Sequence, residues 1–232
     1  MHTLDEISFV PDANALMQVL RIEHGSSTAA EFHGFLRAVE PFAAPKAVYR
    51  EAFVEARDGD VIALGGVTFS SAALAHNLKD VERVFAYVVT CGVELDGAAP
   101  EAGDPLQQFW LDAVKASALS RAREFLSSRL AKTYAIAKFA HMNPGAGDAD
   151  VWPLEQQREL FGLLGDVRGA IGVTLTDSFL MLPNKTVSGV MFATEHDFKS
   201  CQLCRRAVCP GRRAPYDAGL ATEMGLGKDD GA

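Results

Sequence analysis

Three of the four cysteines lie close together near the end of the sequence, in the run Cys201-Gln202-Leu203-Cys204 and the pair Cys209-Pro210. Two cysteines separated by two residues can direct both sulfurs at one metal ion, because a tight turn brings their side chains together. A third cysteine five positions later, followed by proline, is typical of iron–sulfur ligand runs. The spacing therefore predicts a metal site that leaves one coordination position for a ligand from elsewhere.

Cys91 is the remaining cysteine, and it follows a predicted buried strand at a turn. We expect it to complete a ligand set of Cys91, Cys201, Cys204 and Cys209. Such a set suits structural zinc or a 4Fe–4S cluster, and the ligand types alone do not choose between them. The alternative is four reduced cysteines without a metal. Four arginines would offset the negative charge of the thiolates: Arg205, Arg206, Arg212 and Arg213.

A second stretch that can contact a ligand is the loop Asn143-Pro144-Gly145-Ala146-Gly147-Asp148. Its glycines tolerate positive φ, and its proline cannot continue a helix. Such a loop brings backbone N–H and C=O groups close to a ligand with no Cβ in the way. The following residues, Trp152-Pro153-Leu154-Glu155, begin an amphipathic helix with proline in its first turn.

Strand-like patterns indicate the sheet that must position these two regions. Residues 84–90 form an apolar run rich in β-branched and aromatic residues, which indicates a buried strand. Alternation over residues 48–56, the Asp58-Gly59 pair and residues 61–64 predict a hairpin. Further strands are expected over residues 171–175, 178–182 and 187–192, the last two joined by a tight turn at Pro183-Asn184-Lys185.

Helices are expected around these strands. A first helix is expected after Pro11-Asp12, and Ser26-Ser27-Thr28 supply candidate N-caps for a second. A short helix is predicted over residues 72–78. Residues 105–138 hold the longest helical pattern, without internal proline or glycine, and we expect this helix to pack on the sheet. The order of elements predicts an α+β fold, a twisted antiparallel sheet flanked by helices, rather than a βαβ dinucleotide-binding fold.

No repeat or linker-like stretch divides the chain. We therefore expect a single domain over residues 1–218, which includes a cysteine-rich segment at residues 198–213. Residues 1–9 are expected to be a frayed start. The Gly- and Asp-rich residues 219–232 are expected to be a disordered tail.

The composition excludes several functional classes. The 232-residue chain is 48% hydrophobic and 22% charged, as in soluble globular proteins. Its net charge of −8 argues against nucleic acid as a partner, because phosphates require a basic surface. No apolar run is long enough to cross a bilayer, and the N-terminus lacks a signal-peptide pattern. We expect a cytoplasmic protein with no membrane association.

Several motifs in combination resemble the reactivation (activation) domain of cobalamin-dependent methionine synthase, and more specifically its free-standing, short-chain members. The motifs are the Pro-Gly loop at 143–147, WPLEQQ at 152–157, LTDS at 175–178 and PNKTVSG at 183–189. Earlier pieces with the same resemblance lie at 45–49, 65–69 and 89–92. The resemblance covers roughly residues 10–200 and implies the activation-domain fold.

This resemblance implies that the chain binds S-adenosylmethionine and docks over the cobalamin of a partner. In that family the domain holds the methyl donor in line with cobalt while inactive cob(II)alamin is reduced and methylated. Carried over by position, the donor site comprises His141, Asn143, Pro144, Gly145 and Ala146. Trp152 is added as a residue that can stack on an adenine or a corrin, with a core anchor as the alternative. His141 replaces an arginine that pairs with the donor's carboxylate, and Ala146 replaces a tyrosine. No catalytic residue is assigned, because the chemistry takes place at a cofactor on another protein.

Three functions are compatible with the sequence. The first is a separate reactivation subunit of a split cobalamin-dependent methionine synthase, a methyltransferase of methionine biosynthesis. The second is an iron–sulfur electron donor or activator for another corrinoid-dependent methyltransferase. The third is a zinc-stapled, non-enzymatic binding module. We favour the first, and with it iron–sulfur over zinc, because reactivation consumes an electron. The expected partners are a cobalamin-binding methionine synthase or other corrinoid protein, and a flavodoxin or ferredoxin.

Overall fold

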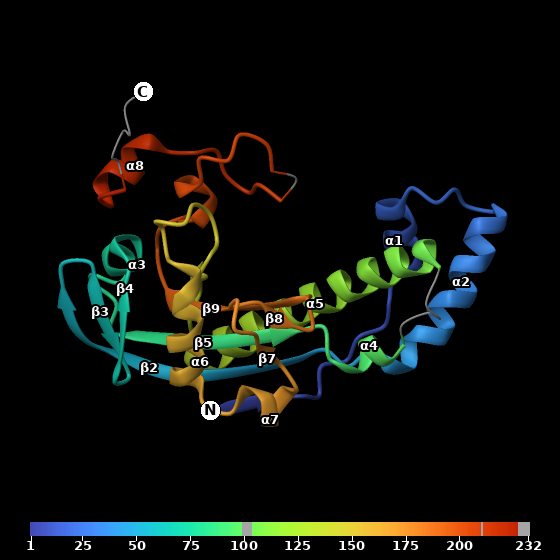
Figure 1. The fold of residues 1–232 in the computed structure, drawn as a ribbon, viewed down its shortest axis with the longest axis horizontal. Helices are drawn as coiled ribbons and strands as arrows, with labels where there is room; N and C mark the ends of the chain where they lie inside the picture. Colours follow the sequence, from blue (N-terminus) through green and yellow to red (C-terminus); the bar gives the residue numbers. More distant parts are fainter. Residues whose placement is uncertain (99–103, 210, 227–232) are drawn as a thin grey trace.

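The computed structural model describes residues 1–98, 104–209 and 211–226, and its centre is a curled sheet (Figure 1). The strand order is β4 (Val67–Ser70), β3 (Val61–Leu64), β2 (Lys46–Asp58), β5 (Arg83–Thr90), β9 (Thr186–Ala193) and β6 (Phe139–Met142). A further strand, β1 (His2–Leu4), pairs with β2. Every pairing among the described strands is antiparallel. The predicted α+β class, with a twisted antiparallel sheet flanked by helices, is confirmed.

The long strand β2 pairs with three other strands: β1, β3 and β5. Its first half pairs with β1 and its last residues pair with β3, with an irregularity in register between Val54 and Ala56. Such a bulge bends a strand and increases its twist. The predicted β2–β3 hairpin is present, and Gly59 adopts a positive φ of 61° in its turn.

Helix α5 (Pro105–Tyr134) joins the sheet to a helical lobe formed by α1 (Ala13–Leu20), α2 (Ser27–Val39), α4 (Glu94–Gly97) and the start of α5 (Figure 1). Its 30 residues span about 45 Å. Ala122, Leu126 and Leu130 pack on the sheet, whereas Trp110 and Val114 belong to the core of the lobe. The helix ends four residues earlier than predicted, because Ala135 turns into the left-handed conformation. No described helix combines the length and apolar character needed to cross a membrane.

The other face of the sheet is covered by α3 (Ala72–Asn77), α6 (Gln157–Leu164) and α7 (Val167–Ile171), with a short 3-10 turn at Leu154–Gln156 before α6. Another 3-10 turn, Glu40–Phe42, follows α2 in the helical lobe. Trp152 lies in this core, fully buried, with its ring edge-on to Phe69. Its indole N–H donates to Oε1 of Gln156 at 3.0 Å. The buried indole therefore fixes the start of α6.

Four sequence predictions are wrong. The start of the chain is not frayed, because β1 pairs with β2. The strand predicted from Ile171 is the end of α7, followed by β7 (Thr174–Leu175), because Gly172 ends the helix with a positive φ. β8 (Met181–Leu182) pairs with β7 rather than β9. The predicted tail contains α8 (Ala218–Glu223), although residues 227–232 lie outside the described residues.

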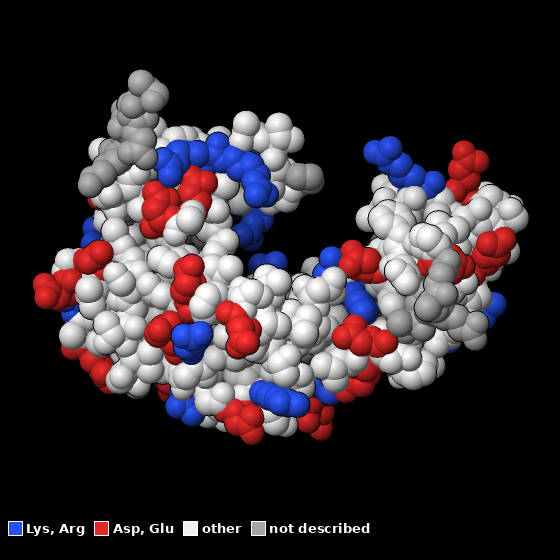
Figure 2. Space-filling model, in the orientation of Figure 1, with Lys and Arg blue, Asp and Glu red and all other residues white. Residues whose placement is uncertain are grey.

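The molecule is hollowed between the C-terminal segment and the helical lobe (Figure 2). In the same orientation, α5, β8 and β9 lie beneath this hollow (Figure 1). Basic side chains gather along the wall formed by the C-terminal segment, on the left of Figure 2. The hollow is therefore bordered by segments that lie far apart in the sequence.

Candidate functional site

The motifs singled out in the sequence meet at Ser188 on β9. The Ser188 hydroxyl donates to Oε1 of Gln157 on α6 at 2.6 Å. Its backbone carbonyl accepts a hydrogen bond from Nδ2 of Asn143 at 2.6 Å. The Pro-Gly loop, the WPLEQQ helix start and the VSG segment therefore form one hydrogen-bonded unit.

The neighbouring glutamine fastens the start of α6 to the opposite edge of the sheet. The Gln156 side chain accepts from the backbone N–H of Ser70 at 3.0 Å and donates to its carbonyl at 2.6 Å. An amide side chain here satisfies the strand edge as another strand would. Consecutive glutamines thus bind β4 and β9, which fixes the position of the helix across the sheet.

Gly189 lets Asn143 reach across β9 to a buried tyrosine. Nδ2 of Asn143 donates to the Tyr87 hydroxyl at 2.8 Å, and Tyr87 lies opposite Gly189 in the register of β5 and β9. A Cβ on Gly189 would lie 2.2 Å from the Met142 carbonyl oxygen and 2.4 Å from Nδ2 of Asn143. Burial raises the pKa of the Tyr87 hydroxyl, so Tyr87 is protonated at neutral pH.

The Pro-Gly loop is a tight turn. The Ala146 N–H donates to the Asn143 carbonyl at 3.1 Å, and Gly145 has a φ of 74°. Proline followed by a glycine with positive φ is the signature of a type II turn. The Gly145 N–H donates to the Trp152 carbonyl at 2.8 Å. The N–H groups of Gly145 and Ala146 are thus used internally, whereas the carbonyls of Pro144, Gly145 and Ala146 accept no hydrogen bond from any described residue.

His141 is half-buried on β6, with its ring edge-on to Tyr87 at 6.2 Å between centroids. Its Nδ1 is buried and has no hydrogen-bond partner among the described residues. Burial lowers the pKa of His141 to about 4, assisted by the positive charges of Arg123 and Arg213. The imidazole is therefore neutral at pH 7 and carries no charge for a carboxylate.

Sequence reasoning missed Tyr87 and Arg123 as members of this site. Tyr87 is one apolar position of a buried strand, and only strand register places it beside His141 and Asn143. Arg123 sits in the pattern of a long helix. One signal was available, because no acidic residue stands three or four positions from Arg123 to pair with it.

Trp152, predicted to contact the ligand, does not line this region. It is fully buried between the loop and α6, so its ring cannot stack on a ligand without unfolding the core. The sequence-predicted residues that the structure does bring together are His141, Asn143, Pro144, Gly145 and Ala146, which are consecutive apart from Met142.

The structure does not bring Cys91 to the other cysteines. Cys91 is fully buried in the core of the helical lobe. The Ser200 hydroxyl, next to Cys201, donates to the His141 carbonyl at 3.2 Å, and His141 lies in register with Phe85 through Met191. Cys91 is six residues beyond Phe85, or about 20 Å along the sheet. The four-cysteine ligand set is therefore not assembled here.

The cysteine-rich segment is held by arginines. The Arg212 guanidinium donates to the carbonyls of Cys201 and Cys204, each at 3.3 Å, and to those of Arg206 and Ala214. Arg205 pairs with Asp148 at 2.6 Å and Asp150 at 3.1 Å, which ties the segment to the Pro-Gly loop. No group of three or more His, Cys, Asp or Glu side chains within residues 1–98, 104–209 and 211–226 is placed to hold a metal ion.

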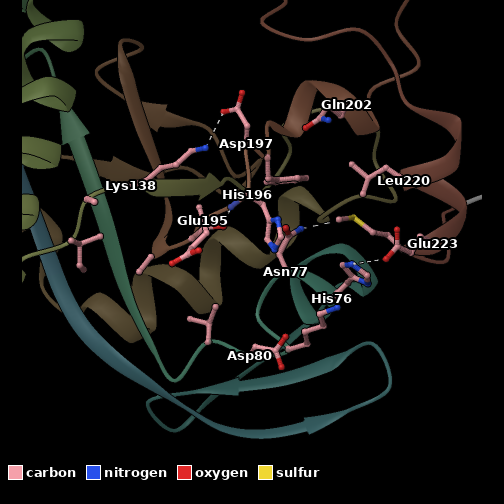
Figure 3. A pocket seen from close by; sticks show the side chains of 18 of the residues that line it. His76, Asn77, Asp80, Lys138, Glu195, His196, Asp197, Gln202, Leu220 and Glu223 are labelled. Atoms are coloured by element: carbon pink, nitrogen blue, oxygen red, sulfur yellow. Dashed lines mark hydrogen bonds and ion pairs between the residues drawn. The ribbon is translucent and has the colours of Figure 1, made fainter.

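A separate cavity of about 930 Å³ lies at the far end of β9 (Figure 3). Two pairs of its ionisable side chains lie close together: His76 and Glu223 at 3.7 Å, and Lys138 and Asp197 at 3.6 Å. None of the sequence-predicted ligand residues lines it. The candidate site is therefore the region around His141, Asn143 and Tyr87.

Comparisons with known proteins bear on the family resemblance and on the fold. Residues 128–201 match the family described as "Vitamin B12 dependent methionine synthase, activation domain". Thirteen chains of solved structures match, among them "Crystal Structure of the MetH Reactivation Domain bound to AdoHcy", with 19% identity over 78% of this chain and 70% of that chain and a TM-score of 0.57. No curated protein matches the sequence. The predicted family resemblance is confirmed over the matched residues, and the fold is that of the reactivation domain.

The Gly189→Ala variant is expected to lose about 2–4 kcal/mol of unfolding free energy, because its Cβ displaces Asn143 and the β6 backbone. Gly162→Ala is the matched control. Its Cβ meets no atom within 4 Å on α6, and it is expected to be neutral or to gain up to about 1 kcal/mol. Urea denaturation measures both, and equal stabilities of the two variants would contradict the role of Gly189.

His141 is expected to make the fold sensitive to acid. Its pKa is about 4 when folded and 6.5 when unfolded, so below pH 6.5 the unfolded chain takes up the proton first. The stability is complete above pH 6.5, and about 3 kcal/mol is lost as the pH falls to about 4. In urea denaturation from pH 7 to 4.5, His141→Gln should show a shallower decline than wild type. Parallel curves, or an NMR titration of His141 near pH 6.5, would refute this.

Proposed function

We propose that this protein supports the reductive remethylation of cob(II)alamin in a methionine synthase, with S-adenosylmethionine as methyl donor, and that it acts as a separate subunit. One observation carries this proposal. Asn143, Gln157 and Ser188 tie the three signature motifs into one unit, and all three lie within the residues that match the activation-domain family.

The residues around this unit are compatible with a sulfonium nucleoside. The turn presents carbonyl oxygens, and Oδ1 of Asn143 accepts no hydrogen bond from any described residue. These hydrogen-bond acceptors suit a positively charged molecule such as the methyl donor S-adenosylmethionine. The neutral His141 and the protonated Tyr87 themselves carry no charge that would repel the sulfonium. We therefore assign binding and orientation of the methyl donor to His141, Asn143 and the Pro144–Ala146 turn.

The hollow supports docking on a corrinoid protein. Elements that border it carry exposed large hydrophobic side chains that a docked partner would cover: Leu106 and Phe109 on α5, Leu180 and Leu182 at β8, and Val208 in the cysteine-rich segment. The partner's cobalamin, when present, supplies the cobalt that accepts the methyl group. The chain's own contribution is to position the donor and to exclude water.

The proposal predicts two measurable activities. Calorimetry is expected to detect S-adenosylmethionine binding, alone or with a cob(II)alamin methionine synthase that lacks its activation domain. Adding this protein, S-adenosylmethionine and a flavodoxin or ferredoxin reductant is expected to restore methyl transfer by that enzyme. Asn143→Ala should weaken donor binding about tenfold or more, because the turn loses its anchor. Lys79→Ala, in the separate cavity, is the control. No binding heat and no reactivation would refute the proposal.

The metal site also remains a proposal, now limited to Cys201, Cys204 and Cys209 with a fourth ligand from outside the set. Because the described residues do not group these three side chains around one point, the segment would rearrange around a bound metal. An iron–sulfur cluster there would favour the electron-donor function, whereas zinc would favour a structural role. The observation in its favour is that three reduced, half-buried cysteines lie in a segment that Arg212 holds in shape.

Metal analysis of anaerobically purified protein tests this proposal. We expect bound iron with absorbance near about 400 nm, or bound zinc. Cys204→Ser should lose the metal and Cys91→Ser should retain it, because Cys91 is buried elsewhere. A metal-free wild-type protein would exclude the site.

A further inference from the structure

We propose that Arg123 and Arg213 together bind the carboxylate of the methyl donor, in place of the arginine that the family carries at the His141 position. This inference rests on the proposed function. It names the ligand group as the carboxylate of an amino-acid-bearing sulfonium nucleoside. It also makes the C-terminal segment, outside the residues that match the family, part of the donor site.

Arg123 projects from the side of α5 that faces β9. Asp112 and Arg123 are eleven residues apart, which is close to three helical turns, so they share one side of the helix. Asp112 pairs at 2.9 Å with Lys185, in the turn between β8 and β9. Arg123 is half-buried and forms no hydrogen bond or ion pair with any residue that the structure describes. Its guanidinium is therefore available at the edge of the sheet where β9 and β6 pair.

Arg213 approaches the same place from the cysteine-rich segment. Its backbone N–H donates to Sγ of Cys201 at 3.5 Å. The residue before Cys201, Ser200, donates its hydroxyl to the His141 carbonyl at 3.2 Å. These two contacts place the Arg213 backbone near the strand that carries His141.

The contacts of α5 and of the cysteine-rich segment bring both arginines toward the edge of the sheet that carries His141. In agreement with this placement, both positive charges lower the pKa of His141 and oppose the rise in the pKa of Tyr87. The acidic residues around them have other partners, since Asp148 and Asp150 bind Arg205 and Asp112 binds Lys185.

Neither Arg123 nor Arg213 therefore has an acidic partner among the residues that the structure describes. Two cations beside a neutral histidine, in a chain with a net charge of −8, mark a place where a ligand supplies the negative charge. A guanidinium matches a carboxylate because its planar fork donates two parallel hydrogen bonds. Two such groups hold the amino-acid end of the donor against the C-terminal segment, so that its nucleoside end extends over α5.

Calorimetric titration of the full chain with S-adenosylmethionine and with 5′-methylthioadenosine, which lacks the amino-acid group, tests this inference. Arg123→Gln and Arg213→Gln should each weaken S-adenosylmethionine binding about tenfold or more and leave 5′-methylthioadenosine binding unchanged. Arg123→Lys should restore part of the affinity. Arg121→Gln is the matched control on the same helix, because Arg121 binds the Ser8 carbonyl on another side. Circular dichroism melts verify that each variant is folded.

The outcomes separate this inference from the proposed function. Binding of S-adenosylmethionine that both Gln variants retain would overturn the two-arginine site and leave the proposed function standing. Equal losses of affinity for both nucleosides would also overturn it, because the arginines would then not recognise the carboxylate. Inorganic phosphate that binds wild type as tightly as the donor would indicate a general anion site and reject it. Absence of nucleoside binding by wild type would reject both proposals.

Discussion

The arrangement of the site depends on the missing Cβ of Gly189. Strand β9 lies between the loop that follows β6 and the tyrosine on β5, and any side chain at this position would separate them. Its absence lets Asn143 donate to Tyr87 and to the backbone of Ser188 together. The loop is thereby fixed to the interior of the sheet rather than to its edge. A loop held in this way can present carbonyl groups to a ligand without paying further conformational entropy.

The electrostatics of the site follow from burial. A half-buried imidazole beside two arginines takes its neutral form, because both desolvation and the neighbouring charges oppose protonation. Histidine at this position therefore cannot act as a cationic substitute for arginine near neutral pH. The positive charge of the region comes from α5 and from the C-terminal segment. These cations reach His141 because α5 spans the hollow and the segment after β9 folds back over β6.

The cysteine-rich segment has a structural role that is independent of any metal. The Arg212 guanidinium donates hydrogen bonds to four carbonyl groups of the segment. Arg205 forms ion pairs with Asp148 and Asp150, which connect the segment to the Pro-Gly loop. The segment is thereby placed as one wall of the hollow. Because Cys91 lies in the helical lobe, a metal on the remaining three cysteines would need a ligand from a different part of the protein or from a partner.

Local patterns determined much of the fold. Short-range periodicity and turn chemistry predict several elements that the structure contains. These are the helix starts near Asp12 and Ser26, the Asp58-Gly59 turn, the buried strand β5 and the long helix α5. Periodicity failed at 171–175, where a short helix ended by Gly172 mimics an alternating strand. The sequence also predicted the turn that carries the candidate site residues, since a Pro-Gly turn has a fixed local conformation.

Only the tertiary structure decided which distant residues meet. Strand register put Tyr87 opposite Gly189, three turns of helix put Arg123 on the side of Asp112, and the fold separated Cys91 from Cys201. These are contacts between residues tens of positions apart. They depend on the pairing and packing of whole elements, which spacing along the chain does not encode.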